Sequence, residues 1–136
     1  MARILAVDFG EKRIGLATSD VSASLATPRL TLTRKSDRAL LEELVRFCRE
    51  EEIGLAVFGI PRSPAGFESP FAGRIRSFAA KFEATTGLPV RFHEETLTSD
   101  EAARRLSRPS PREEIDRMAA AVLLEDYLQS VGRSAR

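Results

Sequence analysis

The chain has 136 residues, of which 43% are hydrophobic and 30% are charged. This balance excludes a disordered chain, and the length fits one domain but not two, so we expect a single domain over residues 1–136. Lysine and arginine total 21 against 20 acidic residues, which gives a formal net charge of +1 and excludes a strong overall attraction to a polyanion. Any contact with nucleic acid must therefore come from local clusters of basic residues.

The first part of the chain predicts three strands. Residues 3–8 and 14–19 are apolar runs joined by a turn-like segment that contains Gly10, which indicates a hairpin. Residues 29–33 alternate between polar and apolar side chains after Pro28 and predict a third strand. We expect these strands to form an antiparallel meander.

The rest of the chain alternates between helices and strands. Ser36 and Pro70 suit helix starts, Gly87 suits a helix end, and Thr98 with Glu101 matches a capping box. The predicted elements are a helix over 36–51, a buried parallel strand over 55–60, a helix over 70–86, a strand over 90–93, a short helix over 98–106 and a helix over 113–129. We expect a mobile loop near 107–112 and a frayed C-terminus. This order predicts an α/β fold with a mixed five-stranded sheet, three antiparallel strands followed by parallel βα units, flanked by helices.

The single cysteine, Cys48, has no partner for an internal disulfide and lies among apolar residues where a small thiol packs well. The chain lacks an apolar run of about 18 residues, the length needed to span a bilayer. We therefore expect a cytoplasmic protein with no membrane partner.

Three carboxylates far apart in the sequence are the candidate catalytic and metal-binding residues. Asp8 closes the first strand, Glu95 follows the strand over 90–93, and Asp116 lies beside alanines on the last helix. If the fold gathers them, their like charges conflict unless a cation neutralises them. Carboxylate oxygens suit one or two Mg²⁺ or Mn²⁺ ions, and two ions about 4 Å apart could activate water and stabilise the leaving oxygen in phosphodiester cleavage. The alternative is that Asp8 and Glu95 are ordinary solvated residues at turns and strand ends.

Two groups of basic residues are candidates for nucleic-acid contact. Lys12 and Arg13 lie in the turn after Asp8, where they could reach a phosphate, although they could equally be an exposed hairpin tip. A second group has no acidic residue between its members, which suits phosphate contact but is also compatible with solubilising surface charge. Its members are Arg104, Arg105, Arg108 and Arg112.

Four segments together resemble the signature blocks of the YqgF/RuvX family, and they cover nearly the whole chain in the family's order. They are Asp8 to Ala17 (DFGEKRIGLA), Val57 to Pro61 (VFGIP), Phe92 to Thr98 (FHEETLT) and Asp116 to Ala120 (DRMAA). The resemblance implies an RNase H-like fold and a metal-dependent nuclease whose acidic triad is Asp8, Glu95 and Asp116. It implies a role in maturing the 5′ end of precursor 16S ribosomal RNA, or alternatively in resolving Holliday junctions in branched DNA.

The chain departs from the family pattern at three positions. Thr96 stands where a basic residue is usual, and Ser63 and Ala65 stand where Asn and Asp are usual. These changes leave the acidic triad intact but bear on substrate contact and turnover.

Two other functions stay open. The first is a binding module that docks on structured RNA without cutting it, which Thr96 favours. The second is a nucleotide-binding phosphotransferase, because Asp8 and Gly10 followed by Lys12 and Gly15 also suit the related kinase and ATPase fold. That fold needs two such domains. The sequence leaves the oligomeric state open between a monomer and a homodimer.

Overall fold

The computed structural model describes residues 2–61, 68–95, 99–106 and 108–134, without the side chains of 99–101 and 133–134. Its elements follow the predicted order. They are β1 (Arg3–Phe9), β2 (Arg13–Ser19), β3 (Ala26–Thr33), α1 (Asp37–Glu50), β4 (Ile53–Pro61), α2 (Pro70–Thr86), β5 (Val90–Glu95), α3 (Ser99–Arg105) and α4 (Arg112–Ser134).

The five strands form one mixed sheet in the order β3-β2-β1-β4-β5. The pairs β1–β2 and β2–β3 are antiparallel, whereas β4 runs parallel to both β1 and β5. The predicted fold class is therefore confirmed. The carboxyl ends of β1, β4 and β5 meet at one edge of the sheet, which is where α/β proteins commonly bind their ligands.

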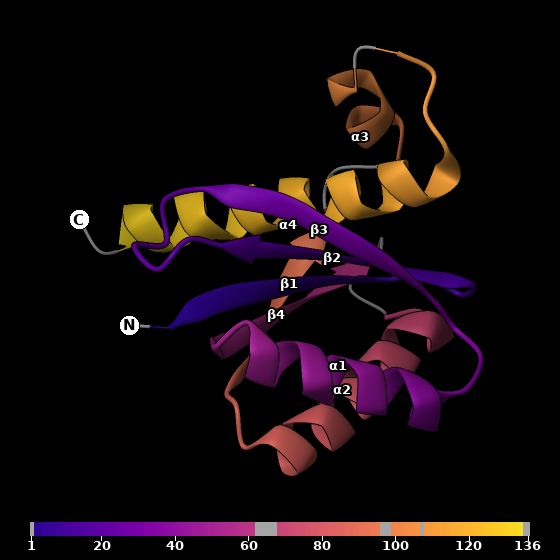
Figure 1. The fold of residues 1–136 in the computed structure, drawn as a ribbon, viewed down its shortest axis with the longest axis vertical. Coiled ribbons are helices and arrows are strands. Elements are labelled where there is room, and N and C mark those ends of the chain that lie inside the picture. Colours follow the sequence, from indigo (N-terminus) through magenta and orange to yellow (C-terminus); the bar gives the residue numbers. More distant parts are fainter. Residues whose placement is uncertain (1, 62–67, 96–98, 107, 135–136) are drawn as a thin grey trace.

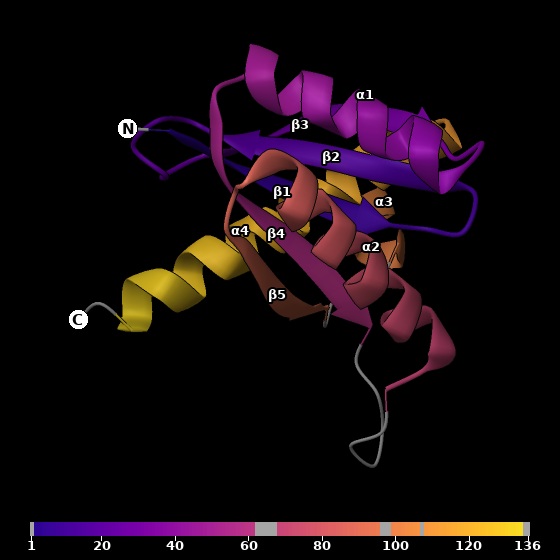
Figure 2. The same cartoon turned by 90° about the horizontal axis from the view of Figure 1, so that it is seen from below.

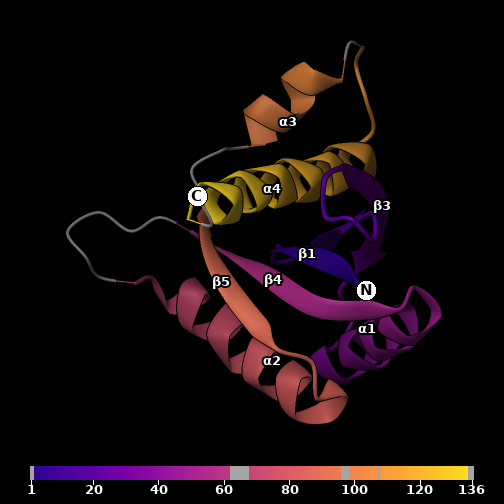
Figure 3. The ribbon, with the colours of Figure 1, turned by 90° about the vertical axis from the view of Figure 1, so that its left-hand side faces the viewer.

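Helices cover both faces of the sheet (Figure 1). Helices α1 and α2 lie side by side across one face, as the view from below shows (Figure 2). Helix α4 crosses the opposite face, and α3 lies outside α4 (Figure 3). The sheet is thus the middle of three layers.

The two interfaces of the sheet differ in the size of their side chains. Large residues such as Phe58, Phe78 and Phe82 fill the core beneath α1 and α2. The core beneath α4 is built largely from alanines, on both the sheet and the helix: Ala6, Ala17, Ala120 and Ala121. Small side chains let a helix approach a sheet closely, so α4 packs tightly against the strands.

Local signals explain where the helices begin and end. The Ser36 hydroxyl accepts a hydrogen bond from the Ala39 amide at 3.1 Å, and the Ser69 hydroxyl accepts one from the Ala72 amide at 3.2 Å. Helix α2 begins with Pro70 and ends at Gly87, whose φ of 74° suits glycine. The caps predicted at Ser36, Pro70 and Gly87 are confirmed.

Several predicted boundaries were wrong, among them the start of β4, which is Ile53 rather than Leu55. β3 begins at Ala26, three residues before the predicted Arg29, because Pro28 is tolerated in an edge strand. β5 continues to Glu95, which pairs with Pro61, so Glu95 ends the strand rather than following it. α4 runs to Ser134, beyond the predicted Gln129.

Some predictions fall on residues outside the described ranges. The capping role of Thr98, and the positions Ser63, Ala65 and Thr96, lie there, as does the side chain of Glu101. The predicted loop at 107–112 lies between α3 and α4, with Ser107 outside the described residues and Arg112 as the first residue of α4. Its mobility stays a prediction.

Candidate active site

The sheet brings Asp8 and Glu95 to the same edge and the same face. Asp8 lies two residues after Ala6, which packs beneath α4, so by strand alternation its side chain also faces α4. Glu95 lies two residues after His93, whose ring contacts Asp126 and Tyr127 of α4. Both carboxyl groups therefore lie on the α4 side, at the carboxyl ends of β1 and β5.

The carboxyl groups of Asp8 and Glu95 are in hydrogen-bond contact, with Glu95 donating a proton to Asp8. Burial, followed by this bond and the charge of Asp8, raises the pKa of Glu95 to about 10. Burial and the nearby charge of Asp116 also raise the pKa of Asp8. Two buried carboxyl groups in contact can keep only one charge between them, so the metal-free site holds a proton near neutral pH.

Asp116 lies in the first part of α4 and shares a pocket with Asp8, but it has its own partner. Its Oδ2 atom accepts a hydrogen bond from Nε of Arg13 on β2 at 2.6 Å. The two side chains are 19% and 27% exposed, so the ion pair is partly sheltered from water. A guanidinium thus neutralises the third carboxylate. The side chain of Arg13, predicted to contact nucleic acid, is in this structure tied to an acid of the candidate triad.

A pocket of about 430 Å³ opens at this place, and most of its lining is charged. Lys12 and Arg112 line it together with Asp8 and Asp116, so acidic and basic groups face the same space. The full lining is Asp8, Gly10, Glu11, Lys12, Arg13, Arg112 and Asp116.

The side chains of Asp8, Glu95 and Asp116 lie in one region of the protein, but their carboxyl groups do not form a set of metal ligands in this structure. Among the residues that the structure describes, no group of three or more acidic, histidine or cysteine side chains stands ready to hold an ion. The physical reason is visible in the contacts, since Glu95 shares a proton with Asp8 while Asp116 is bonded to Arg13. The donor set nevertheless fits a hard divalent cation, because an oxygen-only cluster of half-buried carboxyl groups is costly without a compensating charge.

The second basic group is partly engaged in surface ion pairs. Arg105 pairs with Glu125 at 2.6 Å, and Arg108 pairs with Glu114. Arg104 is exposed on α3, and Arg112 lines the pocket. Of the four, Arg112 is therefore the one that the structure places against Asp8 and Asp116. Nucleic-acid contact by the group stays a prediction.

His93, on the edge strand β5, is half-buried between β5 and α4. Its Nε2 atom lies 2.6 Å from Oδ2 of Asp126, and its ring stands edge-on to Tyr127 with centroids 5.8 Å apart. These contacts fasten β5 to α4, the two elements that carry Glu95 and Asp116.

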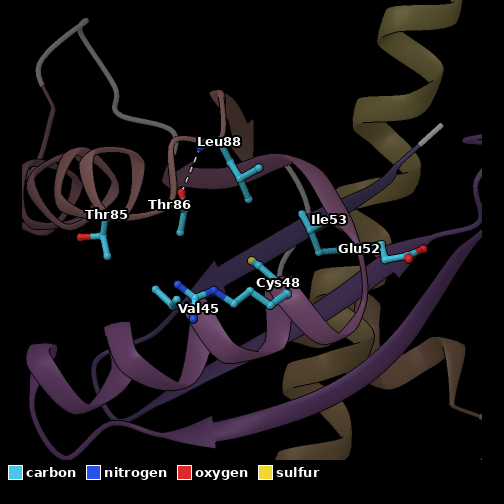
Figure 4. Close-up of a pocket in the computed structure, with 8 residues that line it drawn as sticks. Val45, Cys48, Glu52, Ile53, Thr85, Thr86 and Leu88 are labelled. Carbon is cyan, nitrogen blue, oxygen red and sulfur yellow. Dashed lines mark hydrogen bonds between the residues drawn. The ribbon is translucent and has the colours of Figure 1, made fainter.

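A second pocket, of about 280 Å³, lies on the other face of the sheet between the ends of α1 and α2 (Figure 4). Cys48 lines it with Val45, Ile53 and Leu88 among others. Burial raises the pKa of the Cys48 thiol to about 12, so the thiol is neutral and packs as a small apolar group. The acids lie elsewhere, and this pocket takes no part in their chemistry.

The protonated Glu95 leads to a prediction about stability and pH. Its pKa rises from an ordinary 4.5 to about 10 on folding, so the folded protein binds a proton that the unfolded chain has lost. The free energy of unfolding of the metal-free protein must therefore fall as pH rises from about 4.5 toward 10. Glu95→Gln keeps a donor to Asp8 without the acid, so we expect it to stabilise the protein at pH 8 by at least about 1.4 kcal/mol more than at pH 5. Urea unfolding in excess chelator at both pH values measures this difference; the same effect at both would contradict it.

The ion pair of Arg13 leads to a second prediction. Because the guanidinium competes with any cation for Asp116, we expect Arg13→Gln to bind Mn²⁺ about fivefold more tightly than the wild type, equivalent to about 1 kcal/mol. Titration calorimetry measures the affinity. Arg38→Gln, which removes a fully surface pair with Glu42 on α1, is the matched control and should change nothing. Unchanged or weaker Mn²⁺ binding by Arg13→Gln would mean that Arg13 does not compete.

This sheet, with acids at the ends of β1 and β5 and a third on the helix packed over them, defines a protein of the RNase H-like fold class. Solved structures agree. RuvC from T. thermophilus in complex with a Holliday junction substrate superposes with a TM-score of 0.63 at 13% identity, covering 97% of each chain. The resolvase of Fowlpox virus bound to Holliday junction DNA gives a TM-score of 0.61 at 14% identity, covering 95% of this chain and 98% of that one. At such low identity the likeness establishes the shared fold.

The chain belongs to the RuvX family, whose model, described as Holliday junction resolvase, matches residues 2–130. A protein of Moorella thermoacetica is 39% identical over 97% of this chain and 98% of its own length. One of Thermoanaerobacter pseudethanolicus is 32% identical over 94% of this chain and 96% of its own length. Both carry the name "Putative pre-16S rRNA nuclease". The family resemblance of the four sequence segments is thereby confirmed.

In the part of the chain that the structure describes, none of the helices has the length and hydrophobicity needed to cross a lipid bilayer.

Proposed function

We propose that this protein is a divalent-metal-dependent nuclease that hydrolyses phosphodiester bonds in precursor 16S ribosomal RNA, during maturation of its 5′ end in the cytoplasm. The observation that carries the proposal is the contact between the half-buried side chains of Asp8 and Glu95, with Asp116 and basic side chains in the adjoining pocket. A pair of desolvated acids that share a proton lowers the stability of a fold, and such groups concentrate at functional sites. Membership of the RuvX family and the names of its relatives support the nuclease class.

Asp8, Glu95 and Asp116 would hold one or two Mg²⁺ or Mn²⁺ ions. The ion would supply Lewis-acid stabilisation of the charge that develops on phosphate oxygens during hydrolysis. Asp8 has the central place, because it contacts Glu95 and feels the charge of Asp116. Glu95 would give up its proton to become a ligand, and Asp116 would exchange Arg13 for the ion.

The basic residues of the pocket would position the substrate. Lys12 and Arg112 face the same space as the acids, where a cation can pair with a phosphate group of the backbone. Arg13, once released from Asp116, would be a third such cation. Contacts of this kind ignore base sequence, so recognition of one cleavage site would depend on the shape of the RNA.

A second candidate function is resolution of Holliday junctions. The description of the family model favours it. Symmetric cutting of a four-way junction needs two active sites facing one another, so this function requires a dimer. A protein that is strictly monomeric in light scattering would count against it.

A panel of substrates separates the functions. Precursor 16S RNA, unstructured RNA and four-way junction DNA are each incubated with Mg²⁺, Mn²⁺ or chelator, and the products are mapped on sequencing gels. We expect metal-dependent cleavage of the precursor RNA near the mature 5′ end. Symmetric cleavage of the junction alone would favour the resolvase, and tight RNA binding without cleavage would favour the binding module.

A further inference from the structure

Glu95 has to cross an entire strand to reach Asp8. In the order β1-β4-β5 the strand β4 lies between the two acids. Neighbouring strands are about 4.8 Å apart, so β1 and β5 are separated by about 10 Å. The contact between the carboxyl groups therefore requires the Glu95 side chain to lie flat over β4.

Gly59 is the residue of β4 beneath that side chain. A Cβ atom at position 59 would lie 2.8 Å from each of Cγ, Cδ and Oε1 of Glu95. Phe58 and Ile60 on either side of it belong to the core under α1 and α2, so position 59 faces the α4 side, where the acids lie. The pairing of Val7 with Phe58 puts Gly59 one step further along, level with Asp8.

The backbone gives no other reason for a glycine at this position. Among the described residues, the glycine with positive φ is Gly87. The pairing of β4 with β5 runs through Gly59 and His93 without a register shift, so position 59 is no bulge. An alanine suits regular strand geometry as well as glycine does, and the obstacle to it is the Glu95 side chain.

We propose that Gly59 is a positioning residue that acts through Glu95: the missing side chain leaves the path by which this carboxyl group reaches Asp8. The inference rests on the proposed function, since the purpose of the contact is to assemble a divalent-metal site. Gly59 touches neither substrate nor ion, and its effect is entirely on where the Glu95 carboxyl group lies.

The test is Mn²⁺ binding by the full-length protein, measured by titration calorimetry. We expect Gly59→Ala to weaken binding by at least about tenfold, because one ligand of the set is displaced. Gly73→Ala is the matched control, since a Cβ atom there meets nothing within 4 Å. Its affinity should equal that of the wild type.

A double-mutant cycle separates positioning from a general structural role. In a Glu95→Ala background, Gly59→Ala should change the Mn²⁺ affinity by less than about twofold, because the side chain it displaces is already gone. If Gly59→Ala fails to fold, adding Glu95→Ala should restore folding by removing the clash.

Three outcomes overturn the inference. They are wild-type affinity in Gly59→Ala, an equal loss with and without Glu95, and a double variant that also fails to fold. If the wild-type protein binds no Mn²⁺, the result contradicts both the proposed function and the inference about Gly59. Wild-type binding that Gly59→Ala retains overturns the inference alone.

Discussion

Replacing Asp8 with asparagine is expected to reduce metal-dependent cleavage of RNA by on the order of 10³-fold, comparable with removal of a principal electrostatic group from an active site. Asp8 is the acid that links the other two, through its contact with Glu95 and its charge interaction with Asp116. Asparagine has the same shape but carries no charge, so it cannot neutralise a divalent ion. Initial rates on precursor RNA at saturating Mn²⁺ measure the loss.

The Asp8→Asn protein should remain fully folded. Burial raises the pKa of Asp8, so its charge is unfavourable in the metal-free state and its removal should not lower the free energy of unfolding. The matched control is Asp20→Asn, in the exposed turn at the far end of β2. The amide oxygen can still accept the two main-chain hydrogen bonds from Ser24 and Leu25, whereas the hydroxyl bonds from Ser22 and Ser24 to Oδ2 would have to reverse, with the amide nitrogen donating. Cleavage by Asp8→Asn at a rate near that of the wild type would remove the acids from the mechanism.

Replacing Gly15 with alanine is expected to lower the free energy of unfolding by about 2–3 kcal/mol, the cost of forcing extra volume into a packed interface. Gly15 pairs with Asp8 across the β1–β2 ladder and lies beneath the start of α4. A Cβ atom there would lie 2.0 Å from the main-chain oxygen of Asp116 and 2.6 Å from its carbonyl carbon. Main-chain atoms cannot rotate away as a side chain does, so α4 would have to move outward and carry Asp116 away from Asp8.

Urea unfolding in chelator measures this loss, with Gly73→Ala as the control. Position 73 is exposed in α2 with open space around it, so alanine there should stabilise the protein by about 0.5–1 kcal/mol through its helix propensity. The two substitutions are chemically identical and are expected to have opposite signs. A Gly15→Ala protein as stable as the wild type would mean that α4 does not need this close approach.

The order of the elements was predictable because its signals are local. Ser36, Pro70 and Gly87 mark helix ends through hydrogen bonds or backbone angles that involve only neighbouring residues. The boundaries that failed depend on distant partners. Nothing local in the acidic pair Glu94 and Glu95 indicates a strand, and it is their pairing with Ile60 and Pro61 that extends β5.

The meeting of the acids could be anticipated, whereas their contacts could not. Parallel strands end at one edge of a sheet, and this explains why the condition set in the sequence analysis, that the fold gathers Asp8 and Glu95, is met. The ion pair of Arg13 with Asp116 joins residues 103 positions apart and leaves no pattern in the sequence. The ion pair of Arg105 with Glu125 likewise leaves no pattern in the sequence that would predict it.

Gly15 and Gly59 are a further sign of the site that the sequence contains. A glycine inside a strand often marks a close approach by another part of the chain. Gly15 and Gly59 both lie inside predicted strands, and each lies beneath an acid of the candidate triad. Knowing which part of the chain approaches them requires the order of the strands and the position of α4, which only the folded structure supplies.

The most direct test of the account is the anomalous scattering of Mn²⁺ in crystals of the wild-type protein grown or soaked with the ion. We expect a peak within about 2.5 Å of carboxylate oxygens from Asp8, Glu95 and Asp116, with Arg13 no longer bonded to Asp116. A crystal at full Mn²⁺ concentration with no peak among these acids, or with Asp116 still bonded to Arg13 and the ion held elsewhere, would contradict it.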